Sequence, residues 1–185
     1  MADIYLGLGS NEDAERNLAL ALSHLATRFT DLQCSRAYRN PPVGRCGSDF
    51  LNLVLRCRTA LSVQEVKGTL REIERAASRV RDARNSDRWT LDIDLLLYGS
   101  CVDPALRLPR EDVLRHAHVL CLLAEIAPCL RHPVSGRTMA AAWQEHRSAA
   151  CDWIIGGRIV STAVPASTAP IVKGESVLHA EPVPV

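Results

Sequence analysis

The sequence predicts an α+β fold in which two helices pack against one mixed or antiparallel sheet. Short Leu- and Val-rich runs typical of strands alternate with two longer segments whose apolar residues recur at helical spacing. The resulting order is strand, helix, strand, strand, helix, strand, which is that of a ferredoxin-like sandwich. A chain of 185 residues, 47% of them hydrophobic, can bury such a core without disulfides or a structural metal.

Local signals place each element. Ile4 to Leu8 is apolar and ends at a Gly-Ser-Asn turn, so it is predicted as a buried strand, with a helix capped near Asn11 or Asp13 after it. A second strand over 32–38 is stopped by the stiff loop at Pro41 and Pro42. Further strands are predicted over 50–59 and 90–98, and further helices from a capping box at 62–65, over 112–123 and over 139–145.

Composition sets the domain limits and excludes several classes of protein. Residues 1–155 are predicted to form the folded domain, and residues 156–185, which lack aromatics, a disordered tail. The net charge of +1 argues against a nucleic-acid-coating protein, and no apolar run has the length of a membrane helix. The seven cysteines contain no CxxC pair, and no signal peptide is evident. A cytoplasmic monomer without nucleic-acid or membrane partners is expected.

The strand predicted over 90–98 carries two carboxylates on one face. Side chains alternate along a strand, so Asp92 and Asp94 point the same way, while Leu91, Ile93 and Leu95 point into the core. The backbones of the two aspartates lie about 6.5–7 Å apart, and at this spacing their carboxylates can hold one or two hard cations such as Mg²⁺. The alternative is a face that is simply exposed to water. Five arginines lie just upstream, which favours phosphoryl transfer: Arg75, Arg79, Arg81, Arg84 and Arg88.

Two further groups of residues have more than one interpretation. Phe50 and Asn52 share a strand face and could stack on and hydrogen-bond a flat heterocycle, or be a core ring and a turn amide. Arg110, Arg115, His116 and His118 form a second basic group, and for the two histidines phosphate contact or plain surface exposure fits better than metal binding.

Several of these motifs together resemble one known family. The residues that carry the resemblance are Tyr5 to Asn11, the Pro-Pro-x-Gly loop over 41–44, Phe50-Leu51-Asn52, Ile73-Glu74, Thr90 to Gly99 and Glu125 to Pro128. In this order they are similar to 6-hydroxymethyl-7,8-dihydropterin pyrophosphokinase, an enzyme of folate biosynthesis. The resemblance implies a ferredoxin-like fold and transfer of pyrophosphate from MgATP to the pterin hydroxymethyl group, with release of AMP.

The resemblance also implies roles for single residues. Asp92 and Asp94 would hold two Mg²⁺ ions, and Arg79 and Arg88 would be catalytic. ATP, the co-substrate, would contact Arg71, Glu74, Arg81, Arg107, Arg110 and His116. The pterin would contact Asn40, Pro41, Val43, Phe50, Asn52 and His118.

The chain departs from the family pattern at its nucleotide and stacking residues. Arg110 replaces the usual His of a Pro-His pair, His116 and His118 replace Arg and Phe of an Arg-x-Phe motif, and Asn40 replaces a Thr. Arg88 is displaced by one residue relative to the usual Pro-Arg-Thr. These changes keep open a non-catalytic or altered-specificity pterin- or nucleotide-binding paralogue. An RNA-binding ferredoxin-like domain would need sheet aromatics and positive charge that this sequence lacks.

Overall fold

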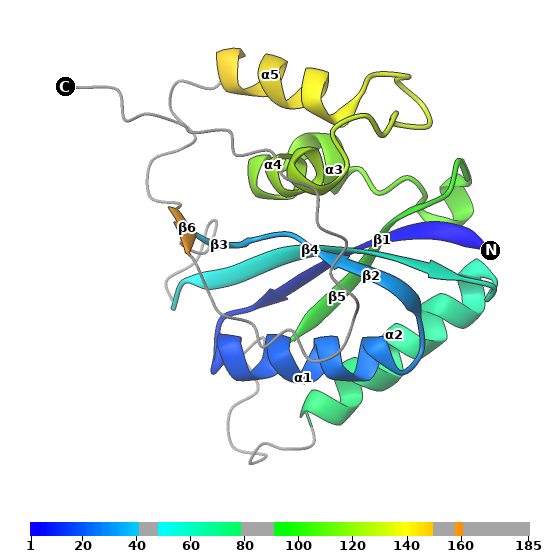
Figure 1. Cartoon of the computed structure of the whole chain (residues 1–185), viewed down its shortest axis with the longest axis vertical. Coiled ribbons are helices and arrows are strands. Elements are labelled where there is room, and N and C mark those ends of the chain that lie inside the picture. The colour runs from blue at the N-terminus through cyan, green and yellow to red at the C-terminus, as the bar shows by residue number, and fades with distance from the viewer. Residues whose placement is uncertain (41–47, 79–90, 150–157, 161–185) are drawn as a thin grey trace.

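A six-stranded antiparallel sheet forms the centre of the molecule (Figure 1). The computed structural model describes residues 1–40, 48–78, 91–149 and 158–160. The strands follow the order β5-β1-β4-β3-β6, and β2 also pairs with β4. Their bounds are β1 (Ala2–Ser10), β2 (Thr30–Cys34), β3 (Ala37–Asn40), β4 (Phe50–Thr59), β5 (Asp92–Tyr98) and β6 (Arg158–Val160).

Helices cover both faces of this sheet. Figure 1 shows α1 (Ala14–Ala26) and α2 (Val63–Ser78) on one face. The opposite face carries α3 (Asp112–Arg115), α4 (Ala117–Ile126) and α5 (Met139–Ala149), and a short 3₁₀ turn, η1 (Pro104–Leu106), lies between β5 and α3. The predicted α+β, ferredoxin-like arrangement is confirmed, and the C-terminal helices add a layer to it. None of the helices among the described residues has the length and apolar character that a membrane crossing needs.

The start of α2 shows how closely local sequence determines this framework. The backbone N–H and hydroxyl of Ser62 both donate to the Glu65 carboxylate at 2.7 Å, which is the predicted capping box. From there, apolar residues at helical spacing face the sheet. The predicted stripe of Val66, Leu70, Ile73 and Ala77 is buried throughout. The helix is therefore fixed both at its N-terminus and along its length.

Removal of the cap should weaken the fold without affecting ligand binding. We expect Ser62→Ala to lower the free energy of unfolding by about 1 kcal/mol, because N-cap hydroxyls contribute about that much. Urea denaturation followed by circular dichroism measures this change. A variant with unchanged stability would contradict the importance of the cap.

The structure corrects three of the predicted boundaries. The strand predicted over 32–38 is two strands, because the chain breaks at Ser35, whose backbone N–H and hydroxyl both bond to the backbone of Val54. The helix predicted over 112–123 is two helices, because His116 adopts an extended backbone (φ −104°, ψ 117°) between α3 and α4. Three residues of the predicted tail, Arg158–Val160, form β6 and pair with β3. Residues 161–185 lie outside the described residues.

Candidate functional site

The two carboxylates of β5 open into one cavity. Asp92 and Asp94 are partly exposed, whereas Leu91, Ile93 and Leu95 are buried, so the predicted alternation of faces is confirmed. Both carboxylates line a cavity of about 400 Å³ at the edge of the sheet. The pair is therefore neither divided between the two faces nor walled off from a cleft.

A row of residues crosses the sheet from these carboxylates. Asp92 is opposite Gly9 on β1, Gly9 is opposite Asn52 on β4, and Asn52 is opposite Tyr38 on β3. Directly opposed residues project from the same face, so Asp92 and Asn52 share a face with only a glycine between them. Two strand spacings separate their backbones by about 10 Å.

A β-bulge at Leu96 ends the polar part of this face. The register between β1 and β5 shifts between Tyr5 and Leu6, so that Leu6 is opposite Leu95 and Tyr5 is opposite Leu97. Leu96 and Leu97 both pack in the core cluster beneath α3, α4 and α5. The face is thus divided into an apolar part under these helices and a polar part that contains the carboxylates.

Helix α2 provides one wall of the cavity. Lys67, Arg71 and Glu74 recur at helical spacing and all line it. The Glu74 carboxylate accepts a hydrogen bond of 2.8 Å from the backbone N–H of Ile93, which fixes α2 against β5. Arg71 and Glu74 were expected in the site. Lys67 was not, although its position one turn before Arg71 was a usable signal.

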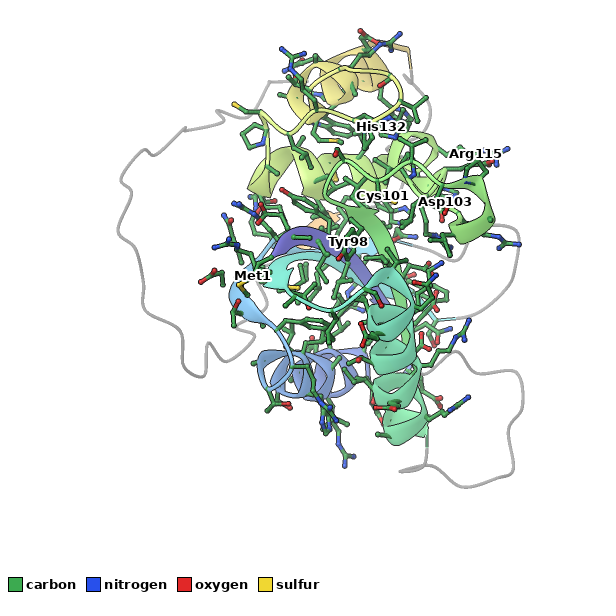
Figure 2. The ribbon with its side chains drawn as sticks, turned by 90° about the vertical axis from the view of Figure 1, so that its right-hand side faces the viewer. Met1, Tyr98, Cys101, Asp103, Arg115 and His132 are labelled. Atoms are coloured by element: carbon green, nitrogen blue, oxygen red, sulfur yellow. The ribbon has the colours of Figure 1, made fainter. Side chains whose placement is uncertain are left out.

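The segment after β5 provides the opposite wall. In Figure 2 the chain passes from Tyr98 through Cys101 and Asp103 to the helix that carries Arg115. Between the last two, Arg107 and Arg110, which are predicted to contact ATP, line the cavity. Arg110 Nη2 lies 2.8 Å from Asp94 Oδ2. Its Nε lies 2.7 Å from Asp112 Oδ2, a partner that sequence reasoning missed.

Three carboxylates, those of Glu74, Asp92 and Asp94, gather on the side of the cavity next to β5. Burial, and then the charge of Asp92, raises the pKa of Asp94 to about 6, despite the opposing effect of Arg110. Burial is also the largest cause of the raised pKa of Glu74, and repulsion from Asp92 and Asp94 adds to it. A cation beside these carboxylates would relieve both effects.

The donor set fits hard divalent cations. Mg²⁺ is held by one or two carboxylates together with water and phosphate oxygens rather than by an all-protein cage. In the described parts of the chain no cluster of three or more His, Cys, Asp or Glu side chains could hold a metal alone. Asp92 and Asp94 would therefore supply the protein ligands, and the remaining positions would belong to water or substrate.

This electrostatic balance predicts how divalent-ion binding depends on pH. With a pKa of about 6, Asp94 is largely ionised at pH 8 and largely protonated at pH 5. Because a metal must displace that proton, we expect the affinity for Mn²⁺ to fall by roughly tenfold per pH unit below this pKa. Calorimetric titration at pH 8, 6 and 5 measures it. A flat profile would place the ion elsewhere.

Three of the predicted pterin contacts lie together on β3 and β4. Asn52 donates from Nδ2 to Asn40 Oδ1 at 2.6 Å, and Phe50 is opposite Asn40 in the strand pair. All three residues are partly exposed. An added Cβ on Gly9 would stand 2.8 Å from Asn52 Oδ1, so a larger residue there would force this amide to move. The group offers one ring and two amides beside the carboxylates.

The two histidines lie side by side at the start of α4. Their rings stack with centroids 5.5 Å apart and an interplanar angle of 26°. Burial, and then the proximity of His116, lowers the pKa of His118 to about 4, so its ring is neutral at physiological pH. His116 Nε2 lies 3.2 Å from Asp112 Oδ1, which connects it to Arg110. Within the described residues no ring contact joins His118 to Phe50.

Five of the expected site residues fall outside the described residues. They are Pro41, Val43, Arg79, Arg81 and Arg88. Their predicted roles in catalysis and in ATP and pterin binding therefore stay predictions.

Comparison with known proteins decides the family. Residues 5–128 match the sequence profile of the 7,8-dihydro-6-hydroxymethylpterin-pyrophosphokinase (HPPK) family, and this stretch contains most of β1, all of β2 to β5 and every residue that lines the cavity. The chain belongs to the HPPK family. Its membership means that it is an ATP-dependent enzyme acting on small molecules.

Relatives of similar length support this assignment. The chain is 40% identical over 148 residues to a 2-amino-4-hydroxy-6-hydroxymethyldihydropteridine pyrophosphokinase of Methylorubrum extorquens, covering 77% of this chain and 92% of the relative. It is 35% identical over 136 residues to the enzyme of that name from Pseudomonas aeruginosa, covering 70% and 83%.

A solved structure confirms the HPPK fold. The chain superimposes on Plasmodium falciparum HPPK-DHPS with pterin and p-hydroxybenzoate at a TM-score of 0.67. The identity is 13%, over 85% of this chain and 47% of the other, so the chain spans less than half of that protein. The likeness therefore concerns the fold alone.

Proposed function

We propose that this protein transfers the pyrophosphoryl group of ATP to the hydroxymethyl group of 6-hydroxymethyl-7,8-dihydropterin and releases AMP, a step of folate biosynthesis. The observation that carries the proposal is the row Asp92–Gly9–Asn52. It places a carboxylate pair suited to cations about 10 Å from an amide suited to a heterocycle, on one face and without a side chain between them.

The nucleotide would occupy the 400 Å³ cavity at the edge of the sheet, between α2 and the segment after β5. Four cationic side chains line this cavity: Lys67, Arg71, Arg107 and Arg110. The carboxylate of Glu74 holds α2 against β5 through its hydrogen bond with the backbone of Ile93. These cations would neutralise and orient the triphosphate, which is most of what a protein contributes to phosphoryl transfer. The predicted contacts of Arg81 and His116 would add to this group.

The carboxylates would hold two Mg²⁺ ions at the phosphates. When bound, the ions would neutralise the charge that develops on the phosphate oxygens. Asp92 and Asp94 would fix their position. Arg110, which pairs with Asp94, would keep a guanidinium beside the same phosphates.

The pterin would lie on the face of β4 that carries Phe50 and Asn52. Phe50 would stack on the ring, and the amides of Asn40 and Asn52 would hydrogen-bond its edge. The neutral ring of His118 is a second stacking surface in the proposal, together with loop residues Pro41 and Val43. Held in this way, the hydroxymethyl oxygen would attack the β-phosphorus of ATP. The bond from that phosphorus to the bridging oxygen of the α-phosphate would break, AMP would leave with that oxygen, and the proton of the hydroxyl would be lost to solvent.

The test is product analysis with the purified full chain. Incubation with MgATP and 6-hydroxymethyl-7,8-dihydropterin should yield AMP and pterin pyrophosphate in equal amounts by chromatography. Release of ADP, or tight pterin binding without any AMP, would contradict the proposal. A reaction without the pterin is the control, because AMP that comes from simple hydrolysis of ATP would still be released there.

A further inference from the structure

Asp112 lies outside the predicted site, yet it contacts two of the residues predicted to bind ATP. Its Oδ2 lies 2.7 Å from Arg110 Nε, and its Oδ1 lies 3.2 Å from His116 Nε2. It is the first residue of α3, and His116 is the residue that separates α3 from α4. One carboxylate thus joins the chain before α3 to the chain after it.

Arg110 is held between two carboxylates from different elements. Its Nη2 is 2.8 Å from Asp94 on β5 and its Nε is 2.7 Å from Asp112 on α3. Its backbone N–H donates to the carbonyl of Leu96 at 3.0 Å. Nη1 has no protein partner among the described residues, and Arg110 lines both the 400 Å³ cavity and a neighbouring one of about 880 Å³. The guanidinium of Arg110 is therefore held in one orientation, with Nη1 available to a ligand.

This pair differs from an ordinary surface ion pair. The side chains of Arg110 and Asp112 are each 29% exposed, whereas those of the adjacent pair Glu111 and Arg115 are 83% and 72% exposed. Exposed pairs at i and i+4 contribute little, because water screens them and flexible side chains must be ordered. The more buried pair with Asp112 restricts Arg110 considerably more.

We propose that Asp112 is a positioning residue that holds Arg110 in place to receive the nucleotide phosphates. Cations bound at Asp94 would compete with Arg110 Nη2 for the same carboxylate. Asp112 keeps Nε anchored when that contact weakens, so the guanidinium stays at the phosphates instead of becoming a free, rotamer-rich side chain. The inference rests on the proposed function, because it assigns the phosphates of ATP to this cavity.

The test compares two neighbouring acidic residues. In Asp112→Asn the shape is kept and the charge is lost, and in Glu111→Gln the same change is made to the exposed pair. We expect Asp112→Asn to weaken binding of Mg²⁺-α,β-methylene-ATP, measured by calorimetry on the full chain, by roughly tenfold. Pterin affinity without nucleotide should stay within about twofold. Glu111→Gln should match the wild-type protein in both, and melting curves verify that each variant is folded.

A double variant tests whether Asp112 acts through Arg110. Arg110→Lys keeps the charge but removes the fork that reaches both carboxylates. If Asp112 acts through Arg110, adding Asp112→Asn to Arg110→Lys should change nucleotide affinity by less than about twofold. A fully additive loss, an Asp112→Asn variant that binds as Glu111→Gln does, or a wild-type protein that does not bind the analogue would overturn the inference. A wild-type protein that binds the analogue but releases no AMP would overturn the proposed function instead.

Discussion

Replacing Asp94 with asparagine is expected to abolish AMP release. The substitution keeps the size of the side chain but removes the charge that a divalent ion needs. Loss of a metal ligand at transferring phosphates costs several kcal/mol, so turnover should fall on the order of a thousandfold or more. The AMP assay measures this loss directly. Asp31→Asn, at an exposed aspartate that pairs with Arg58, is the matched control and should retain activity.

The same substitution should stabilise the ligand-free protein. The pKa of Asp94 is raised to about 6, mainly by burial and then by Asp92, so its environment disfavours the charged form. The side chain is 32% exposed, which reduces the gain from a neutral residue to about 1 kcal/mol. For a chain of this size that amounts to a rise in melting temperature of about 2–4 °C.

The gain in stability should depend on pH in a defined direction. A carboxyl whose folded-state pKa is raised destabilises the native state above that pKa, and the penalty disappears as the pH falls toward the unfolded value. The difference between Asp94→Asn and wild type should therefore be full at pH 8 and vanish as the pH falls from about 6 toward 4. A gain that stays equal at both ends of this range would contradict the electrostatic account.

Replacing Gly9 with alanine should damage pterin binding selectively. The new methyl group would stand 2.8 Å from Asn52 Oδ1, which forces the amide away from Gly9 and disturbs its hydrogen bond to Asn40. Loss of a well-placed hydrogen-bonding group costs about 1–3 kcal/mol, or roughly 10- to 100-fold in affinity. Calorimetry should show this loss for the pterin and little change for an ATP analogue.

Two other glycines serve as controls for this prediction. A Cβ on Gly68, within α2, would meet nothing within 4 Å, so Gly68→Ala should leave binding intact and stabilise the helix by about 1 kcal/mol. A Cβ on Gly7 would meet only the flexible side chain of Leu96 at 3.3 Å. If Gly9→Ala binds the pterin as Gly68→Ala does, Asn52 has no part in pterin recognition.

Short-range patterns in the sequence predicted the elements that carry the site. Alternation placed Asp92 and Asp94 on one face, and the apolar run of β4 gave its bounds, Phe50–Thr59, correctly. The capping box at Ser62 placed the start of α2, and helical spacing placed its buried stripe, whereas Glu74 was predicted at the site only from the family resemblance. These features depend on periods of two and 3.6 residues, which are visible in a single chain.

The features that were missed depend on contacts between distant segments. The break at Ser35 is set by hydrogen bonds to Val54, and the bulge at Leu96 by the register with β1. His116 interrupts the predicted helix without a Gly or Pro to signal it. Asp112 is only two residues from Arg110, but the position of the Arg110 guanidinium also depends on its long-range pairing with Asp94 on β5.

The central claim is that Asp92 and Asp94 jointly hold divalent ions at the nucleotide. Electron paramagnetic resonance with Mn²⁺ and α,β-methylene-ATP tests it directly, because it counts bound ions without requiring turnover. We expect two ions per wild-type chain and the loss of protein-bound manganese in the Asp92→Asn, Asp94→Asn double variant. Equal stoichiometry and affinity in the two proteins would contradict it.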